Sequence, residues 1–300
     1  MNNSRRHFIK TSSALMAGTI FTNSLFAENL KKSVPVSGHL WVYASKFSPE
    51  TGYDCTPVLE TIFSEFKYAG IDGLELMEAI LRHEDAVQKL KELSAKYGVP
   101  VTGSSYGANM WDKNKHSEIL EDVDMLTQRL NQVGGKTFGI SVGDARHIKT
   151  EDELDQQAYL LKDVFEVCIK NGIQANLHNH TYEVTNEMHD LKGTIARIPG
   201  IALGPDLNWL VRGGIDPVAF INTYGHQMVY MHIRDQKADG KWTEVVGDGV
   251  IDFAAIAAAL KKVNFKGRAA IELAFDAPPV NPIKDDWKQS RLYVKNTFGW

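Results

Sequence analysis

Cysteine is scarce in this sequence: its 300 residues include only Cys55 and Cys168. A cysteine-rich zinc or iron–sulfur centre needs several thiolates and is therefore excluded. A fold held by several disulfides is excluded for the same reason. The two cysteines fall in segments with helical periodicity that lie far apart in the sequence. They favour two separate buried thiols, with a single disulfide between them as the alternative.

Long apolar runs and an excess of positive charge are also missing. The weakly apolar segment 12–26 is too short and too polar to span a bilayer. It follows Arg5-Arg6-His7-Phe8-Ile9-Lys10 and ends before Ala27, a small residue suited to cleavage. This order is typical of a twin-arginine signal peptide, with a frayed basic N-terminus as the alternative.

The signal predicts a mature protein that is free in the periplasm of a bacterium. No cysteine follows directly after residue 27, so a lipid anchor is not expected and the cleaved protein should have no membrane contact. Removing residues 1–27 takes away Arg5, Arg6 and Lys10 and changes the net charge from −4 to −4 − 3 = −7. A domain with this charge is a poor nucleic-acid binder, so no nucleic-acid partner is expected.

From residue 39 onward, short apolar runs alternate with longer segments of helical period. Eight runs read as strands: 40–46, 73–77, 99–105, 137–142, 173–180, 201–207, 228–234 and 269–275. The segments that read as helices are 57–69, 84–97, 117–133, 151–171, 186–196, 217–224, 253–263 and 284–297. This alternation predicts parallel strands joined by crossover helices.

Eight such units predict an α/β fold, a (β/α)8 TIM barrel in one domain. The domain plan is a signal at 1–27, a linker at 28–38 and the barrel at 39–300. A doubly wound open sheet is the alternative, but the early turns lack a GxGxxG phosphate loop. Oligomeric state is left open, with a homo-oligomer among the options.

In a barrel of this kind, functional groups lie at the carboxyl ends of the strands. Polar residues occupy several predicted strands among aliphatic neighbours, where they are costly unless paired or metal-bound. They are Glu75, His178, His180, Asp206, His232, Arg234 and Glu272. Because side chains alternate along a strand, His178 and His180 share a face, as do His232 and Arg234. A mixed imidazole and carboxylate site suits a divalent ion such as Mn²⁺, Mg²⁺, Co²⁺, Fe²⁺ or Zn²⁺.

Six segments together resemble the sugar phosphate isomerase/epimerase family, the xylose-isomerase-like TIM barrels. They are "GIDGLEL" (70–76), "NLHNHTYE" (176–183), "DLNWLVRGGIDPVAFINTYG" (206–225), "HIRD" (232–235), "VGDGVIDF" (246–253) and "AAIEL" (269–273). The resemblance implies a divalent metal held by residues that end strands five to eight. Asp206, His232 and Glu272 fall on the last three of these positions, and His178 stands where the family often has a glutamate.

The resemblance thus implies a metal shell of His178, Asp206, His232 and Glu272. The sequence leaves open whether His178 or His180 is the ligand, because both share a face. With His178 as ligand, Glu272 and His180 are the expected acid and base. Glu75, Arg234, Lys46 and Trp209 are the expected substrate-binding residues, and a structural ion pair is the alternative for the first three.

The expected chemistry is removal of a proton next to a sugar carbonyl, through a metal-stabilised enediolate. Return of the proton gives isomerisation or epimerisation, and loss of a neighbouring substituent gives elimination from a keto-sugar. The predicted ligand is a small carbohydrate, and an unphosphorylated one fits a periplasmic location best. The alternatives are an inactive periplasmic sugar-binding barrel and, less favoured, an abasic-site endonuclease. Segment 239–243, which includes Trp242, predicts either a mobile loop over the site or a simple exposed hairpin.

Overall fold

The computed structural model of this protein describes residues 34–300. The expected signal peptide, residues 1–27, and the first part of the linker lie outside the described residues. The first strand begins at Val36, three residues before the predicted start of the barrel. Among the described residues, no helix is long and apolar enough to cross a membrane.

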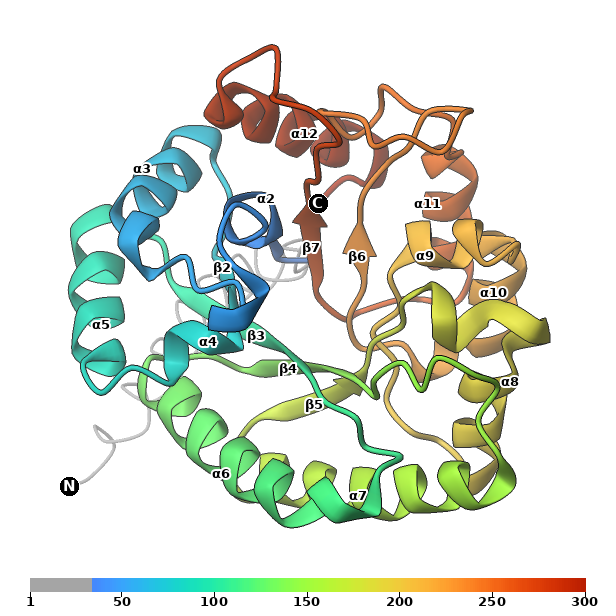
Figure 1. Cartoon of the computed structure of the whole chain (residues 1–300). Helices are drawn as coiled ribbons and strands as arrows, with labels where there is room; N and C mark the ends of the chain where they lie inside the picture. Colours follow the sequence, from blue (N-terminus) through green and yellow to red (C-terminus); the bar gives the residue numbers. More distant parts are fainter. Residues whose placement is uncertain (1–33) are drawn as a thin grey trace, which may run out of the picture. The chain divides into compact units, whose positions relative to one another are not determined.

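A curled, fully parallel sheet of seven strands is the centre of the described region, and Figure 1 shows helices along its outside. The strands, in chain order, are β1 Val36–His39, β2 Leu74–Met77, β3 Val101–Gly107, β4 Thr137–Ser141, β5 Gln174–Leu177, β6 His232–Ile233 and β7 Ala269–Glu272. Their order in the sheet is β5-β4-β3-β2-β1-β7-β6. Neighbouring strands in this order are parallel, so all their carboxyl ends meet at one edge.

Helices fill the connections between the strands. The α-helices are α2 Trp41–Ala44, α3 Leu59–Ala69, α4 Glu78–Leu81, α5 Ala86–Tyr97, α6 His116–Gln132, α7 Glu151–Lys170, α8 Thr181–Arg197, α9 Leu207–Arg212, α10 Pro217–Tyr224, α11 Phe253–Lys262 and α12 Ile283–Phe298. Short 3-10 turns are η1 Pro49–Thr51, η2 Thr56–Val58, η3 Lys113–Lys115 and η4 Gly225–Gln227. The predicted helices are all present, and α2, α4 and α9 are additional.

Local chemistry explains where the longer helices begin and end. Thr150 and Glu153 form a reciprocal capping box that starts α7. Gly70 ends α3 in a left-handed conformation, with φ of 72°, which a residue with a side chain rarely adopts.

The hydrophobic core lies between the layer of helices and the sheet. At one contact, the ring of Phe66 on α3 packs edge-on against Trp287 on α12, with ring centroids 4.7 Å apart.

The predicted first strand, residues 40–46, was wrong. The strand is Val36–His39, and the apolar residues that follow it form the short helix α2. A short apolar run has no periodicity that separates a buried strand from a buried helical turn, and this caused the error. His39 therefore occupies the carboxyl end of β1, whereas Lys46 lies in the exposed turn after α2.

The predicted eight strands are not confirmed, because segment 201–207 forms only isolated bridges. Leu203 pairs with Leu177 and with Met228, and Asp206 pairs with His232. Gly204 lies so close to Asn176 that a Cβ atom there would be 1.8 Å from the Asn176 amide oxygen. Pro205 has no N–H to add to a ladder. The segment thus lies between β5 and β6 but does not build a strand of its own.

Candidate active site

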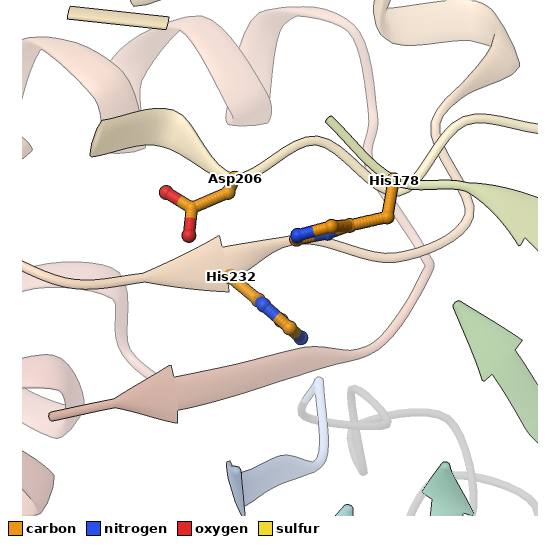
Figure 2. A group of neighbouring side chains, drawn as sticks. All are labelled: His178, Asp206 and His232. Atoms are coloured by element: carbon orange, nitrogen blue, oxygen red, sulfur yellow. The ribbon is translucent and has the colours of Figure 1, made fainter. Parts of the chain in front are cut away.

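Three of the predicted metal ligands lie together at the carboxyl edge of the sheet. His178 directly follows β5, Asp206 caps the N-terminus of α9, and His232 opens β6. Each offers one ligand atom, and these atoms lie within 4.8 Å of one another. Figure 2 shows the three side chains, each on a separate segment. All three are buried, so their polar atoms need partners from within the site.

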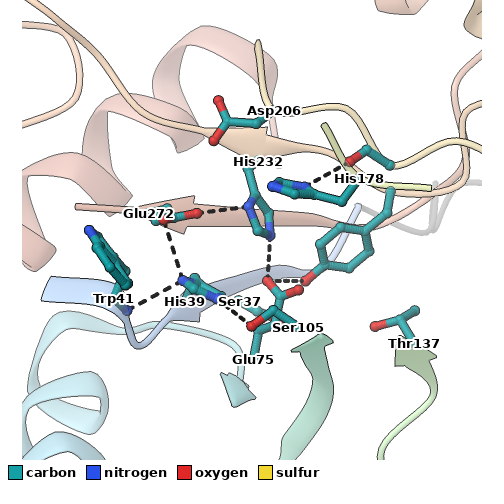
Figure 3. A network of polar contacts seen from close by, with 12 residues as sticks. Ser37, His39, Trp41, Glu75, Ser105, Thr137, His178, Asp206, His232 and Glu272 are labelled. Atoms are coloured by element: carbon teal, nitrogen blue, oxygen red, sulfur yellow. Dashed lines mark hydrogen bonds and ion pairs between the residues drawn. The ribbon is translucent and has the colours of Figure 1, made fainter. Parts of the chain in front are cut away.

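His232 lies between two carboxylates (Figure 3). Its Nε2 atom is 2.7 Å from Oε2 of Glu75, and its Nδ1 atom is 2.8 Å from Oε2 of Glu272. Tyr230 donates its hydroxyl to the same Glu75 oxygen at 3.1 Å. Burial alone would lower the pKa of His232, but the Glu75 and Glu272 carboxylates raise it to about 10. Glu75 fixes the orientation of the ring because it holds the nitrogen that faces away from the cluster.

Arg234 joins the two remaining carboxylates of the site. Its Nε atom is 2.9 Å from Oδ2 of Asp206, and its Nη2 atom forms an ion pair with Oε1 of Glu272. Burial tends to raise the pKa of Glu272, yet the charges of Arg234, His39 and His232 outweigh it and hold this pKa well below its usual range. Glu272 is therefore ionised at neutral pH. For Asp206 burial dominates and raises the pKa.

Two buried atoms of the cluster lack a hydrogen-bond partner among the described residues. They are Oδ2 of Asp206 and Nδ1 of His232. Arg234 Nε and Glu272 Oε2 are close to them but are not aligned for hydrogen bonds. The other Asp206 oxygen accepts the backbone N–H groups of Asn208 and Trp209, which fixes the carboxylate. Buried unpartnered atoms of this kind are expected where an ion completes the site.

The two histidines of "NLHNH" have different surroundings. His178 is buried, and its Nδ1 atom donates to the carbonyl oxygen of Gly204 at 3.2 Å, which leaves Nε2 as a free electron-pair donor. The His180 side chain is 38% exposed, and its Nδ1 atom is 3.0 Å from the Ser141 hydroxyl. Burial lowers the pKa of His178 well below its usual value and that of His180 to about 4, so both are neutral at neutral pH. His178 belongs to the ligand cluster, and His180 lies beside it, 5.1 Å away between ring centroids.

The four residues expected to bind substrate have separate places. Glu75 is buried behind His232, and Arg234 is buried between Asp206 and Glu272. Trp209 is half-buried and packs beside His180, with ring centroids 5.8 Å apart. Lys46 is exposed and does not end a strand, so the premise for its role was wrong.

His39 is a site residue that the sequence prediction missed. Its Nδ1 atom is 3.6 Å from Oε1 of Glu272, and its ring centroid is 5.1 Å from that of His232. Its Nε2 atom is 3.0 Å from the Ser105 hydroxyl at the end of β3. The signal was present in "VSGHL", which ends a strand with a histidine once β1 is placed at Val36–His39.

Residues 63–297 match the family model described as "Xylose isomerase-like TIM barrel". The chain belongs to this family. An inosose dehydratase of Lacticaseibacillus casei is 26% identical over 266 residues, which cover 79% of this chain and 88% of that protein.

Solved structures of two sugar epimerases have a similar fold. A D-allulose 3-epimerase from Methylomonas sp. superposes with a TM-score of 0.71 at 16% identity, covering 88% of this chain and 98% of that one. The 3-keto-D-glucoside 4-epimerase from E. coli superposes with a TM-score of 0.66 at 15% identity, covering 88% and 99%. At these identities the likeness concerns the fold, and the chemistry has to be argued from the site of this chain.

The donor set of this xylose isomerase-like barrel fits a divalent cation. Two imidazoles and a carboxylate form the cluster, and the ionised Glu272 adjoins it. Nitrogen and oxygen donors suit Mn²⁺, Co²⁺, Fe²⁺ or Zn²⁺, and Mg²⁺ where oxygen ligands dominate. Around the cluster lie groups able to accept or donate protons, namely Glu272 and His180. This arrangement is suited to acid–base chemistry on a bound, polarised substrate.

Proposed function

We propose that this protein is a divalent-metal-dependent enzyme that removes a proton next to the carbonyl of a sugar or keto-sugar. The outcome is epimerisation or isomerisation when the proton returns, and dehydration when a neighbouring hydroxyl leaves. The observation that supports this best is the buried cluster of His178, Asp206 and His232, in which two ligand atoms have close charged neighbours but no hydrogen-bond partner among the described residues. Ionised Glu272 adjoins this cluster, as a group that handles protons would.

The metal would be held by His178 Nε2, Asp206 Oδ2 and His232 Nδ1, with Glu272 as the fourth ligand. When bound, it supplies Lewis-acid polarisation of the carbonyl and of a neighbouring hydroxyl, and so acidifies the C–H bond between them. His178 fits this role better than His180, because it lies within the buried cluster and its Nδ1–H is already committed to Gly204. Glu75 holds the far nitrogen of His232, so the near nitrogen faces the ligand position.

Glu272 and His180 are the residues that would transfer the proton. Glu272 is ionised and can accept a proton through its carboxylate. His180 is neutral and partly exposed, so it can accept or return a proton at the open side of the cluster. Arg234 orients the Glu272 carboxylate and supplies positive charge beside the developing enediolate. Trp209, beside His180, forms an apolar surface for the sugar ring.

A keto-sugar or keto-cyclitol is the substrate class we favour. The curated relative named above is an inosose dehydratase, and the structural neighbour from E. coli acts on a 3-keto-D-glucoside. The chain also carries a twin-arginine pattern at residues 1–27, which lie outside the described residues. We therefore propose that the enzyme is periplasmic. This location favours an unphosphorylated keto-sugar as the substrate.

Metal analysis combined with solvent-deuterium exchange tests this function. The purified protein would be assayed for bound divalent metal, then incubated in D₂O with inosose, D-allulose and a 3-keto-D-glucoside. Deuterium at carbon in at least one compound is the expected result, since it reports proton abstraction whatever the final product. Glu272→Gln and His232→Ala should abolish the exchange. His226→Ala, which removes an exposed imidazole on η4, is the matched control and should leave it unchanged. A metal-free protein that binds a keto-sugar without exchange would contradict the proposal.

A further inference from the structure

A hairpin at the carboxyl edge of the sheet carries a tryptophan toward the site. This mouth hairpin, residues 236–242, is closed by an antiparallel bridge between Gln236 and Trp242. Inside it, Lys237 donates its backbone N–H to the carbonyl of Lys241 at 2.7 Å. Gly240 forms its turn with φ of 82°. The segment is thus a hairpin, but not the simple exposed one of the sequence analysis, because Trp242 is half-buried and Thr243 is buried.

One side chain from α9 contacts this hairpin at three points. Arg212, the last residue of α9, donates from Nε to the Gln236 side-chain oxygen at 3.0 Å and from Nη2 to the Gly240 carbonyl. Its guanidinium carbon lies 3.4 Å from the ring centroid of Trp242. The same carbon lies 5.1 Å from the ring centroid of Trp209, and within residues 34–300 Arg212 has no carboxylate partner at ion-pair distance. One planar group therefore contacts the start, the turn and the end of the hairpin.

The two ends of the mouth hairpin are also fixed. Before it, the buried carboxylate of Asp235 accepts the backbone N–H groups of Gly247 at 3.0 Å and Gly249 at 2.9 Å. At the other end, Trp242 donates its backbone N–H to Asp276 at 2.8 Å. The backbone is thus anchored at both ends of the hairpin, and Arg212 contacts the Trp242 ring itself.

Trp242 connects the hairpin to the acid–base residues through Trp209. The two indole rings meet edge to face, with centroids 5.2 Å apart and planes at 87°. Arg234 lies 4.9 Å from the Trp242 ring and 5.1 Å from the Trp209 ring. Trp209 in turn packs beside His180. Contacts between neighbouring rings thus connect Arg212 to His180 through Trp242 and Trp209.

The geometry points to Arg212 as a positioning residue for substrate binding. It holds the mouth hairpin so that Trp242 and Trp209, whose planes meet at 87°, form an angled aromatic wall beside the C–H groups of the carbohydrate ring. Indole faces suit the weakly positive C–H groups of a sugar, whose hydroxyls are left for Arg234 and the cluster. Two of the Arg212 nitrogens are committed to the hairpin, which favours this role over direct capture of a substrate anion. The inference rests on the proposed function, because it assigns the wall to the same site.

Binding and exchange measurements on Arg212 and Trp242 variants test this assignment. The metal-loaded protein would be titrated with inosose, D-allulose and a methyl 3-keto-D-glucoside, and tryptophan fluorescence and calorimetry would give Kd. Arg212→Ala should raise Kd about tenfold or more, with exchange at saturating substrate within about threefold of the parent. Arg212→Lys should not restore binding, because an ammonium cannot make the forked contacts or stack flat on the indole. Lys241→Ala, an exposed change on the same hairpin, is the control and should bind normally.

A double variant separates positioning from direct contact. If Arg212 acts through Trp242, the Arg212→Ala/Trp242→Ala protein should bind no more weakly than Trp242→Ala alone. Trp242→Phe is a second variant that leaves the guanidinium in place, and it should raise Kd by a smaller factor. Normal binding by both Arg212→Ala and Trp242→Ala would overturn the proposal, as would a parent protein that binds none of the three probes. Binding without deuterium exchange would instead overturn the proposed function and leave the aromatic wall supported.

Discussion

Glu75 Oε2 lies 2.7 Å from Nε2 of His232, and this contact joins a carboxylate on β2 to an imidazole on β6 across the sheet. Both residues are buried. The pair explains how His232 can present Nδ1 to the cluster, because its other nitrogen is already bonded. A carboxylate behind a metal-binding imidazole fixes the ring and raises its basicity. Glu75 therefore acts on the site through His232.

Glu75→Gln should weaken metal binding while the fold is retained. The amide has almost the same shape but lacks the charge that holds the His232 ring, so the affinity for Mn²⁺ or Co²⁺ should fall by roughly 10- to 100-fold. Calorimetric titration of the chelator-treated protein at neutral pH measures this. Tyr230→Phe removes only the hydroxyl that donates to Glu75 and should have a smaller effect. Equal affinities for the Glu75→Gln and parent proteins would show that the ring needs no such partner.

The convergence of His178, Asp206 and His232 could be predicted from the sequence, and its reason is geometric. Residues at the carboxyl ends of parallel strands meet at one edge of the sheet. Assigning each residue to the end of its strand was therefore sufficient to predict that the three lie close together. The position of Glu75 could not be predicted, since alternation gives the face of a strand but not which residue on the opposite strand it reaches. His39 was missed because the apolar run 40–44 was read as the strand itself.

Segment 201–207 is a second place where the structure could not be predicted fully from the sequence. Its apolar pattern predicted a strand, but Gly204 and Pro205 reduce it to isolated bridges. The predicted ligand Asp206 nevertheless lies at the carboxyl edge of the sheet, where its carboxylate caps α9 through the N–H groups of Asn208 and Trp209. The contacts of Arg212 with the mouth hairpin have no signature in sequence, since they join α9 to a turn 24 to 30 residues away.

The two histidines of "NLHNH" should respond differently to alanine substitution. His178→Ala removes a ligand from the buried cluster, so stoichiometric metal should be lost. His180→Ala should keep the metal and lose most of the deuterium exchange, because this ring lies beside the cluster. Metal analysis after dialysis, with circular dichroism to verify folding, separates the two. The reverse pattern would assign the ligand role to His180.

Asp235 should be a major contributor to stability although it is not a ligand. Its buried carboxylate accepts four backbone N–H groups, from Gln236, Gly247, Gly249 and Ile251. In Asp235→Asn, an amide N–H₂ group replaces one acceptor oxygen and faces these donors. The free energy of unfolding should fall by about 2–4 kcal/mol, measured with urea. The control is Asp239→Asn on the exposed turn of the mouth hairpin, where a much smaller loss is expected. Similar losses in both variants would contradict the role of Asp235.

Glu183 should make stability depend on pH between about 4.5 and 8. Its Oε2 atom accepts the backbone N–H of His180 at 2.6 Å, while Oε1 has no hydrogen-bond partner among residues 34–300. Burial, and then the nearby Asp190 carboxylate, raise the pKa of Glu183 to about 8 from an ordinary value of 4.5. Below pH 4.5 this carboxyl is protonated in both the folded and unfolded states. Between pH 4.5 and 8 only the folded state keeps the proton, so its stabilising contribution falls as pH rises and is lost above pH 8.

Glu183→Gln isolates this contribution, because the amide oxygen still accepts the His180 N–H and does not titrate. The free energy of unfolding of the variant minus that of the parent should rise from pH 5 to pH 8.5, by on the order of 3 kcal/mol, and then stay level. Urea unfolding at each pH, in the presence of a chelator, gives the difference and cancels groups that titrate alike in both proteins. A difference that is flat across this range would mean that Glu183 is ionised in the folded protein at neutral pH. Its second oxygen would then need a donor, for which the nearby ammonium of Lys149 is the first candidate.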